Sequence, residues 1–275
     1  MSEKSSRLWR YSPPNSALLW KIMFLEPELV VCESRRPKTN KTFFSCLSLH
    51  SGKEILKDFY LEDSCREVTT DSRMTGLETT RGNLFYVHGY QDGSPEHKGL
   101  WAVNPAKASV AWARPEASFV ANLKEGMLVY AAGSFAGFPE RNYMVLDCMT
   151  GEALETIGED AHRANALRDE SLSDEELQKV VLPQTTDPDI SIPELSDVGL
   201  IEYIEHGDLV ITVSHTPGEG GKGFDAVVRA CRNGITVYDD MLAQATDVPC
   251  VNYFLLRGVT LYYVRNMSEL ISVRL

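Results

Sequence analysis

The feature that most constrains the fold is a unit that recurs along the chain. Each copy has two apolar strands around a turn, a polar loop, a strand that ends in a tight turn, and a fourth strand. The tight turns read HSGK from His50, NPAKAS from Asn104, MTGE from Met149 and RNGI from Arg232. A unit of this size buries its apolar face only against neighbouring copies. The sequence therefore predicts an all-β propeller, solenoid or array.

The spacing of the units predicts five blades. Four have all four strands, but the last ends with the chain after three. The segment SRLWRYSPP near the N-terminus supplies a fourth strand, since its Trp9 and Pro13 match Trp112 and Pro115 of another fourth strand. A first strand that completes the last unit removes an open sheet edge. We predict a single five-bladed β-propeller closed by its N-terminal strand, and a β-sandwich or irregular β domain is the alternative. The predicted blades span residues 17–63, 74–116, 118–157, 199–243 and 249–275 plus 6–14.

The turn residues resemble the repeat of quinoprotein-like propellers, in which a hydrophobic strand is followed by Asp-x-x-Thr-Gly and then Trp. The residues that match are Asp147, Thr150 and Gly151, then Asn104 and Trp112, and finally Gly52. Asp or Asn caps such a turn, and glycine adopts a positive φ. The segment HGYQDGSPEHKG is also similar to the hallmark of an uncharacterised bacterial propeller-like family. These resemblances imply a propeller architecture, and they imply neither a quinone cofactor nor a known activity.

Charge and composition exclude several classes of function. The formal net charge is −12 and the pI is about 5.0, which disfavours sequence-independent binding to nucleic acid. No apolar run reaches the roughly 18 residues of a membrane span. The N-terminus has no apolar signal region, and the six cysteines form no C-x-x-C pair. We therefore predict a cytoplasmic protein with buried free thiols and no disulfide.

One acidic stretch, residues 156–198, interrupts the repeat between the third and fourth blades. It has eleven acidic and three basic residues, a net charge of −8. Within it, Ser173 and Glu176 form a capping-box pattern that predicts a short helix, and the segment from Pro183 to Glu194 reads as irregular.

The loops between second and third strands are basic and share one face of a propeller. They contain eight cations and four carboxylates, a sum of +4. Such a face attracts an anionic ligand or partner. We predict ligand-binding residues there at Arg35, Arg36, Lys98, Arg141 and Lys222. We also predict that the acidic insertion lies over Arg35, Arg36, Arg141 or Lys222 as a salt-sensitive lid.

The densest polar cluster contains Lys98 and contributes three further candidates for ligand binding. His215 on the fourth unit joins them only if its loop points inward. Two histidines with carboxylates can bind a metal or move protons. The candidate ligands lie on one hairpin, however, so we predict that they bond to neighbouring backbone and hold no metal. The candidates in the cluster are His88, Tyr90, His97 and Lys98.

The alternative function is a hydrolase or isomerase that uses central-channel carboxylates or histidines. Glu78, Glu202 and Glu205 are the carboxylates on predicted inner strands. The chain has no G-x-S-x-G motif and no phosphate-binding loop. The sequence favours a non-enzymatic binding or scaffold module without a cofactor, which binds a protein or a small anionic ligand. Carboxylates or histidines that converge within about 5 Å would favour the enzyme instead.

Overall fold

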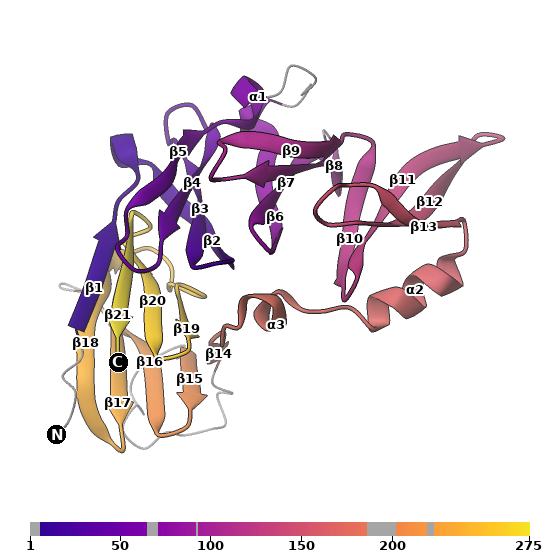
Figure 1. Cartoon of the computed structure of the whole chain (residues 1–275). Helices are drawn as coiled ribbons and strands as arrows, with labels where there is room; N and C mark the ends of the chain where they lie inside the picture. Colours follow the sequence, from indigo (N-terminus) through magenta and orange to yellow (C-terminus); the bar gives the residue numbers. More distant parts are fainter. Residues whose placement is uncertain (1–5, 65–70, 92, 186–201, 219–222) are drawn as a thin grey trace. The chain divides into compact units, whose positions relative to one another are not determined.

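The computed structural model describes residues 6–64, 71–91, 93–185, 202–218 and 223–275. These residues form antiparallel sheets of four or five strands, which is the arrangement predicted for propeller blades. The chain divides into two compact units (Figure 1). We call residues 20–178 the three-sheet unit and residues 1–19 with 179–275 the two-sheet unit.

The three-sheet unit holds the first three predicted blades. Each sheet pairs its strands in chain order, from the first strand to the fourth. The first sheet contains β2 (Leu18–Leu25), β3 (Leu29–Arg35), β4 (Thr42–Ser48) and β5 (Glu54–Phe59). The second contains β6 (Thr75–Arg81), β7 (Leu84–Gln91), β8 (Ser94–Asn104) and β9 (Ser109–Arg114). The third contains β10 (Ala117–Leu123), β11 (Gly126–Phe135), β12 (Phe138–Leu146) and β13 (Ala153–Gly158).

Strand β7 shows why these sheets stack. Its side chains alternate between the two faces of the sheet. Phe85 and Val87 join a core with the first sheet, whereas Leu84 and Tyr86 join a core with the third. The β6–β9 sheet is therefore buried on both faces, so an isolated copy of the unit would leave an apolar face exposed.

The predicted turn at MTGE forms in the structure. Asp147 Oδ1 accepts hydrogen bonds from the backbone N–H groups of Met149 and Thr150, each at 2.8 Å. Gly151 has a φ of +71°, and a Cβ atom there would lie 2.6 Å from the Trp112 ring. Only glycine fits this turn, because the indole of the neighbouring fourth strand occupies the space of a side chain.

The two-sheet unit holds the remaining strands. One sheet has the order β14-β15-β16-β17-β18, and the other has the order β1-β21-β20-β19. Their strands are β14 (Gln184–Thr185), β15 (Glu202–His206), β16 (Leu209–Pro217), β17 (Phe224–Arg232), β18 (Ile235–Thr246), β1 (Ser6–Tyr11), β19 (Phe254–Arg257), β20 (Thr260–Arg265) and β21 (Glu269–Arg274).

The predicted pairing of the two ends of the chain is present. Strand β1 pairs with β21 from Ser6 opposite Arg274 to Tyr11 opposite Leu270. Trp9 is 7% exposed, and its ring lies 6.0 Å from that of Tyr262. The N-terminal strand thus completes the last sheet, whereas a closed ring of five blades stays a prediction.

The acidic insertion contains more structure than the sequence predicted. The predicted capping box is present at α3 (Asp174–Gln178), where the backbone N–H of Ser173 donates to Glu176 and the Glu176 N–H donates to Ser173 Oγ. Helix α2 (Ala161–Asp169) was not predicted; the carboxylate of Asp160 caps it by accepting from the Arg163 N–H. The short strand β14 was not predicted either. The other helical segments are α1 (Leu61–Ser64) and the 3-10 turns η1 (Pro14–Ser16) and η2 (Ser72–Met74). Residues 186–198 of the insertion lie outside the described residues.

The cysteines that the structure describes are free thiols. Burial raises the pKa of Cys46 to about 12 and that of Cys32 further. Both act as small core residues beside apolar strands. Cys65 lies outside the described residues.

Candidate functional site

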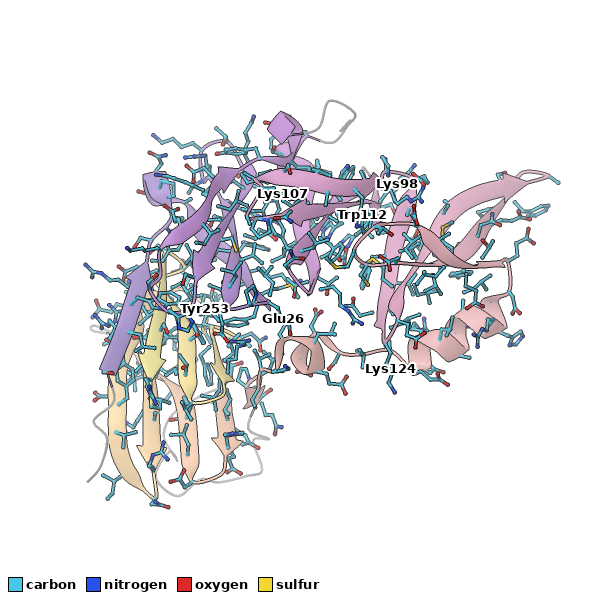
Figure 2. All side chains as sticks on the ribbon, viewed as in Figure 1. Glu26, Lys98, Lys107, Trp112, Lys124 and Tyr253 are labelled. Carbon is cyan, nitrogen blue, oxygen red and sulfur yellow. The ribbon has the colours of Figure 1, made fainter. Side chains whose placement is uncertain are left out.

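Polar side chains gather at one end of the three-sheet unit. We call it the histidine end: it carries the β3–β4, β7–β8 and β11–β12 turns. The opposite pocket end carries the β2–β3, β6–β7 and β10–β11 turns, and these line a pocket of about 390 Å3. Lys98 near the start of β8 and Lys107 in the β8–β9 turn mark the two ends in Figure 2.

Four residues, Glu78, His88, Tyr90 and His97, form what we call the histidine cluster. Glu78 Oε2 lies 2.8 Å from His88 Nδ1 and 2.9 Å from His97 Nδ1. The two imidazole rings stack with centroids 3.5 Å apart and an interplanar angle of 9°. The Tyr90 ring meets both imidazoles edge-on, at 4.7 Å and 5.0 Å. The predicted candidates His88, Tyr90 and His97 therefore converge, and the prediction that the histidines bond to backbone is wrong.

The register of three adjacent strands builds this cluster. Gly76 of β6 is opposite His88 of β7, and Tyr90 of β7 is opposite His97 of β8. Residues opposite each other in an antiparallel sheet share a face. A Cβ atom at Gly76 would lie 2.7 Å from His88 Nε2, so the His88 ring occupies the space left by the missing side chain.

Glu78 is an ionised acceptor in this arrangement. Burial by itself raises the pKa of the carboxyl group, but the contacts with His88 and His97 outweigh it and hold the pKa at about 2. His88 is 5% exposed, and its Nε2 has no hydrogen-bond partner among the residues the structure describes. A buried ring nitrogen without a partner is costly and calls for a ligand or a proton acceptor.

The basic loops are less available than the sequence predicted, because neighbouring carboxylates and rings engage their cations. Arg35 donates to Glu33 and stacks over Trp20 at 4.3 Å. Arg36 donates to Tyr60 Oη at 2.6 Å and lies 3.9 Å from Asp58. These contacts neutralise much of the charge expected on this face.

Arg141 and Lys98 lie at the histidine end. Arg141 forms an ion pair with Glu96, whose other oxygen accepts from Tyr130 Oη at 2.9 Å. Lys98 is exposed on β8, one residue after His97. The third sheet therefore contributes Tyr130 and Arg141 beside the β7–β8 hairpin.

The two remaining candidates belong to the two-sheet unit. His215 belongs to the two-sheet unit, is buried, and accepts a hydrogen bond at Nε2 from the Cys250 N–H at 2.9 Å. This bond links β16 to the segment that precedes β19, so the imidazole has a structural role. Lys222 lies outside the described residues.

The carboxylates of the hydrolase alternative lie in different environments. Glu202 accepts from the Asn252 N–H at 2.9 Å and 3.0 Å, and burial raises its pKa. Glu205 is exposed on β15. Of the three predicted carboxylates, Glu78 is the one that contacts His88 and His97.

The lid prediction is wrong for residues 159–178. Gln178 of α3 accepts from the Phe24 N–H, Asp174 accepts from Thr79, and Leu172 pairs with Asn122. Leu177 also lines the pocket between the β2–β3 and β6–β7 turns. These contacts place the insertion on β2, β6 and β10, the first strands of the three sheets, near the pocket end and opposite the basic loops. Hydrogen bonds and apolar contacts hold it there, which the charge count did not predict.

Asp174 and Thr79 are site residues that sequence analysis missed. Asp174 Oδ1 accepts from Thr79 Oγ1 at 2.8 Å, and Asn122 also donates to Thr79 at 2.8 Å. Burial raises the pKa of Asp174. Thr79 directly follows Glu78 on β6, and the Glu78 charge contributes to the raised pKa of Asp174. The contact spans 95 residues of sequence, and no local pattern signals it.

Comparisons with known proteins leave the chain without an established family. The model of a domain of unknown function, DUF4905, matches residues 25–112, which is less than half of the chain and includes the histidine cluster. No curated protein matches the sequence. In the described residues, no helix is long and apolar enough to cross a membrane.

The similar solved structures are distant. An acylaminoacyl peptidase of Pyrococcus horikoshii is 10% identical, with a TM-score of 0.32; the alignment covers 90% of this chain and 36% of the peptidase, about a third of its length. A GH130 glycoside hydrolase that targets β-1,2-mannosidic linkages in Candida mannan is 8% identical, with a TM-score of 0.32 and coverage of 95% and 85%. The β-propeller domain of the Pyrococcus furiosus trilobed protease is 10% identical, with a TM-score of 0.30 and coverage of 92% and 64%. These similarities are too weak to assign an activity.

Proposed function

We propose that this chain is a five-bladed β-propeller that acts as a binding module and engages a protein partner at the histidine end. Two observations support the propeller. The antiparallel sheets follow the predicted units, and β1 completes the sheet of β19–β21.

The convergence of the histidine cluster carries the binding proposal. Its Tyr90 is 37% exposed and the side chain of His97 is 35% exposed. On the adjacent hairpin, Phe138 is 73% exposed, three residues from Arg141. Exposed aromatic and arginine side chains are the residue types that dominate binding energy at protein interfaces. The face therefore combines apolar anchors with a histidine and cations that can meet an acidic or polar rim.

A comparison of two sets of substitutions tests the proposal. The site variant changes Tyr90, Lys98 and Phe138 to alanine, and the control variant changes Lys53, Lys107 and Lys124 to alanine. The control positions lie in turns at the pocket end, with Lys107 and Lys124 marked in Figure 2. Wild type, site variant and control variant are immobilised at equal density, exposed to extract from the native source, and compared by quantitative mass spectrometry.

We expect at least one protein that wild type and control retain and that the site variant loses by tenfold or more. Its purified form should then bind wild type directly. If every retained protein binds the three forms equally, the binding face is wrong. Circular dichroism and melting curves show whether the site variant is folded.

A hydrolase is the second candidate, favoured by the electrostatic interaction of Glu78 with Asp174. Their environments shift the two pKa values in opposite directions, as in acid and base pairs of enzymes. Glu78 is ionised and can act as a base or nucleophile, whereas Asp174 is the carboxyl group better suited to donate a proton. Turnover of aryl glycosides or aryl esters that both Glu78→Gln and Asp174→Asn abolish would support this candidate. No turnover by folded wild type across the panel would exclude it for those substrates.

A further inference from the structure

We propose that Glu78, His88 and His97 bind one divalent transition-metal ion, of which zinc is the representative. The inference rests on the same cluster as the proposed binding face, but it concerns a metal ion and is tested separately. One carboxylate oxygen and two imidazole nitrogens, all within 4.8 Å of one another, provide the ligand atoms. The sequence predicted no metal here, because the candidate ligands lie on one hairpin and Glu78 of β6 was not among them.

The distances are close to those of a bound ion. The two Nδ1 atoms lie 2.8 Å and 2.9 Å from Glu78 Oε2. Zinc binds histidine nitrogen and carboxylate oxygen at about 2.0 to 2.2 Å, which separates two ligand atoms of a tetrahedral ion by about 3.4 Å. Each nitrogen therefore needs to move by only about half an ångström relative to the oxygen.

The stacked rings define what must change on binding. Parallel rings 3.5 Å apart direct their nitrogen lone pairs along parallel planes, so the ion must tilt the rings apart. His88 is held by Gly76 and Tyr90, while His97 is more exposed and has room to turn. We expect His97 to make the larger movement.

The ring nitrogens of the two imidazoles are placed suitably for coordination through Nδ1. In the metal-free cluster, the Nδ1 atoms of both imidazoles lie within 2.9 Å of Glu78 Oε2. Coordination through Nδ1 leaves Nε2 as the nitrogen of each ring that carries a proton. His88 Nε2, without a partner among the described residues, is free to carry the proton, and Tyr90 Oη lies on the same side of the ring.

The chemistry of the donors selects the metal. Two imidazoles and one carboxylate suit zinc, cobalt or nickel, whereas magnesium and calcium prefer an all-oxygen site. Three protein ligands leave a fourth position of a tetrahedral ion for water or a group of the partner. The half-exposed His97 places that position toward solvent.

Zinc titration of chelator-treated, full-length protein tests the proposal, with binding measured by calorimetry and by metal analysis after dialysis. The site variant is His97→Ala. The matched control changes the exposed histidines His50, His162 and His206 to alanine, which removes surface imidazoles elsewhere. Nitrogen-15 NMR of the histidine rings reports directly on Nδ1 coordination and tautomer.

We expect one zinc ion per chain in wild type and in the control, at least tenfold weaker binding in His97→Ala, and no binding of magnesium or calcium. The Nδ1 signals of two histidines should shift. If zinc does not bind wild type, if His97→Ala binds equally well, or if the control loses the ion, the proposal is wrong. A Glu78→Gln variant that stays folded and keeps full zinc affinity would also overturn it. The experiment with immobilised protein and extract measures partner binding and not zinc binding. Either proposal can therefore be wrong while the other holds.

Discussion

At the residue scale, Gly76 determines how His88 is packed. The imidazole of His88 fills the space beside the glycine, and a methyl group there would lie 2.7 Å from Nε2 and 3.0 Å from Tyr90 Oη. We predict that Gly76→Ala destabilises the protein by about 1 to 3 kcal/mol, because an added methyl group in a packed site forces neighbours to move.

Thermal and urea denaturation measure the effect of Gly76→Ala. The double variant Gly76→Ala/His88→Ala is the control, because removal of the ring relieves the clash. The two substitutions should then be non-additive, with a coupling energy of the order of 1 kcal/mol. Strict additivity would show that Gly76 and His88 do not share this space.

Asp240 is the residue whose ionisation most clearly supports the two-sheet unit. Its Oδ2 accepts from Arg7 at 3.2 Å and from Tyr238 at 3.2 Å, and it also contacts Tyr263 and Arg265. Burial raises the pKa of Asp240, but the Tyr263 hydrogen bond and the Arg265 charge outweigh it, so the pKa is lowered. A single carboxylate thus joins strands β1, β18 and β20.

This lowered pKa predicts a specific loss of stability in acid. The unfolded carboxyl titrates near 3.8, so the contribution of Asp240 is complete above that pH. It is lost as the pH falls through the lower pKa of the folded state. Asp240→Asn should lower the free energy of unfolding at pH 7 by about 2 to 3 kcal/mol, as for a hydrogen-bonded charge.

Urea denaturation between pH 2.5 and 7 tests Asp240, with the exposed neighbour Asp239→Asn as the control. Stability of Asp240→Asn should decline less steeply than that of wild type below about pH 4. Identical acid slopes in wild type and Asp240→Asn would contradict the role of this carboxylate.

At the scale of elements, the strands were more predictable than the insertion. Alternating apolar residues and the turn at Asp147 to Gly151 are local signals, and the structure follows them. The capping box at Ser173 is equally local. The position of α3 is different, because Gln178 bonds to Phe24 across 154 residues of sequence. The charge count predicted that the acidic insertion lies over the basic loops. Hydrogen bonds to β2 and β6 hold α3 near the pocket end instead.

The same distinction between local signals and long-range contacts explains why the histidine cluster was only partly predicted. Its members were visible as polar residues on strands, but their convergence depends on the register of β6, β7 and β8. A register shift of one residue would direct His88 to the opposite face. The hairpin was recognisable in the sequence, whereas the pairing of Gly76 with His88 was not.

The contacts of α3 predict that its hydrogen exchange is insensitive to salt. Gln178 is buried and accepts from Phe24 at 2.9 Å, and Asp174 accepts from Thr79 at 2.8 Å. Salt weakens interactions between exposed charges much more than hydrogen bonds of buried groups. Amide protection across residues 172–178 should therefore be equal at 50 mM and 500 mM sodium chloride.

Mass spectrometry at peptide resolution measures this protection, and Gln178→Ala is the informative variant. It should increase exchange in residues 172–178 at both salt concentrations, because the Phe24 N–H loses its acceptor. A large loss of protection in wild type at high salt would restore an electrostatic docking mechanism.

At the scale of the whole molecule, the pairing of the two chain ends carries the propeller proposal. Strand β1 contributes the outer edge of the last sheet through its pairing with β21. Without it, β21 would expose unpaired backbone groups along its length. Repeat units depend on neighbouring units for burial, so loss of one edge affects more than the strand itself.

We predict that deletion of residues 1–13 sharply lowers the melting temperature. The deletion removes Trp9, which is 7% exposed, and loss of a buried Trp side chain costs about 3 to 5 kcal/mol. It also removes Arg7 from the Asp240 carboxylate.

Deletion of residues 1–4 is the control, because it leaves all of β1 in place. Calorimetric melting of the three proteins distinguishes them: the control should match wild type, and the longer deletion should melt far lower and gain a tendency to associate through the exposed edge of β21. A melting temperature that the longer deletion leaves unchanged would show that β1 is dispensable, and closure of the ring by the N-terminal strand would then be wrong.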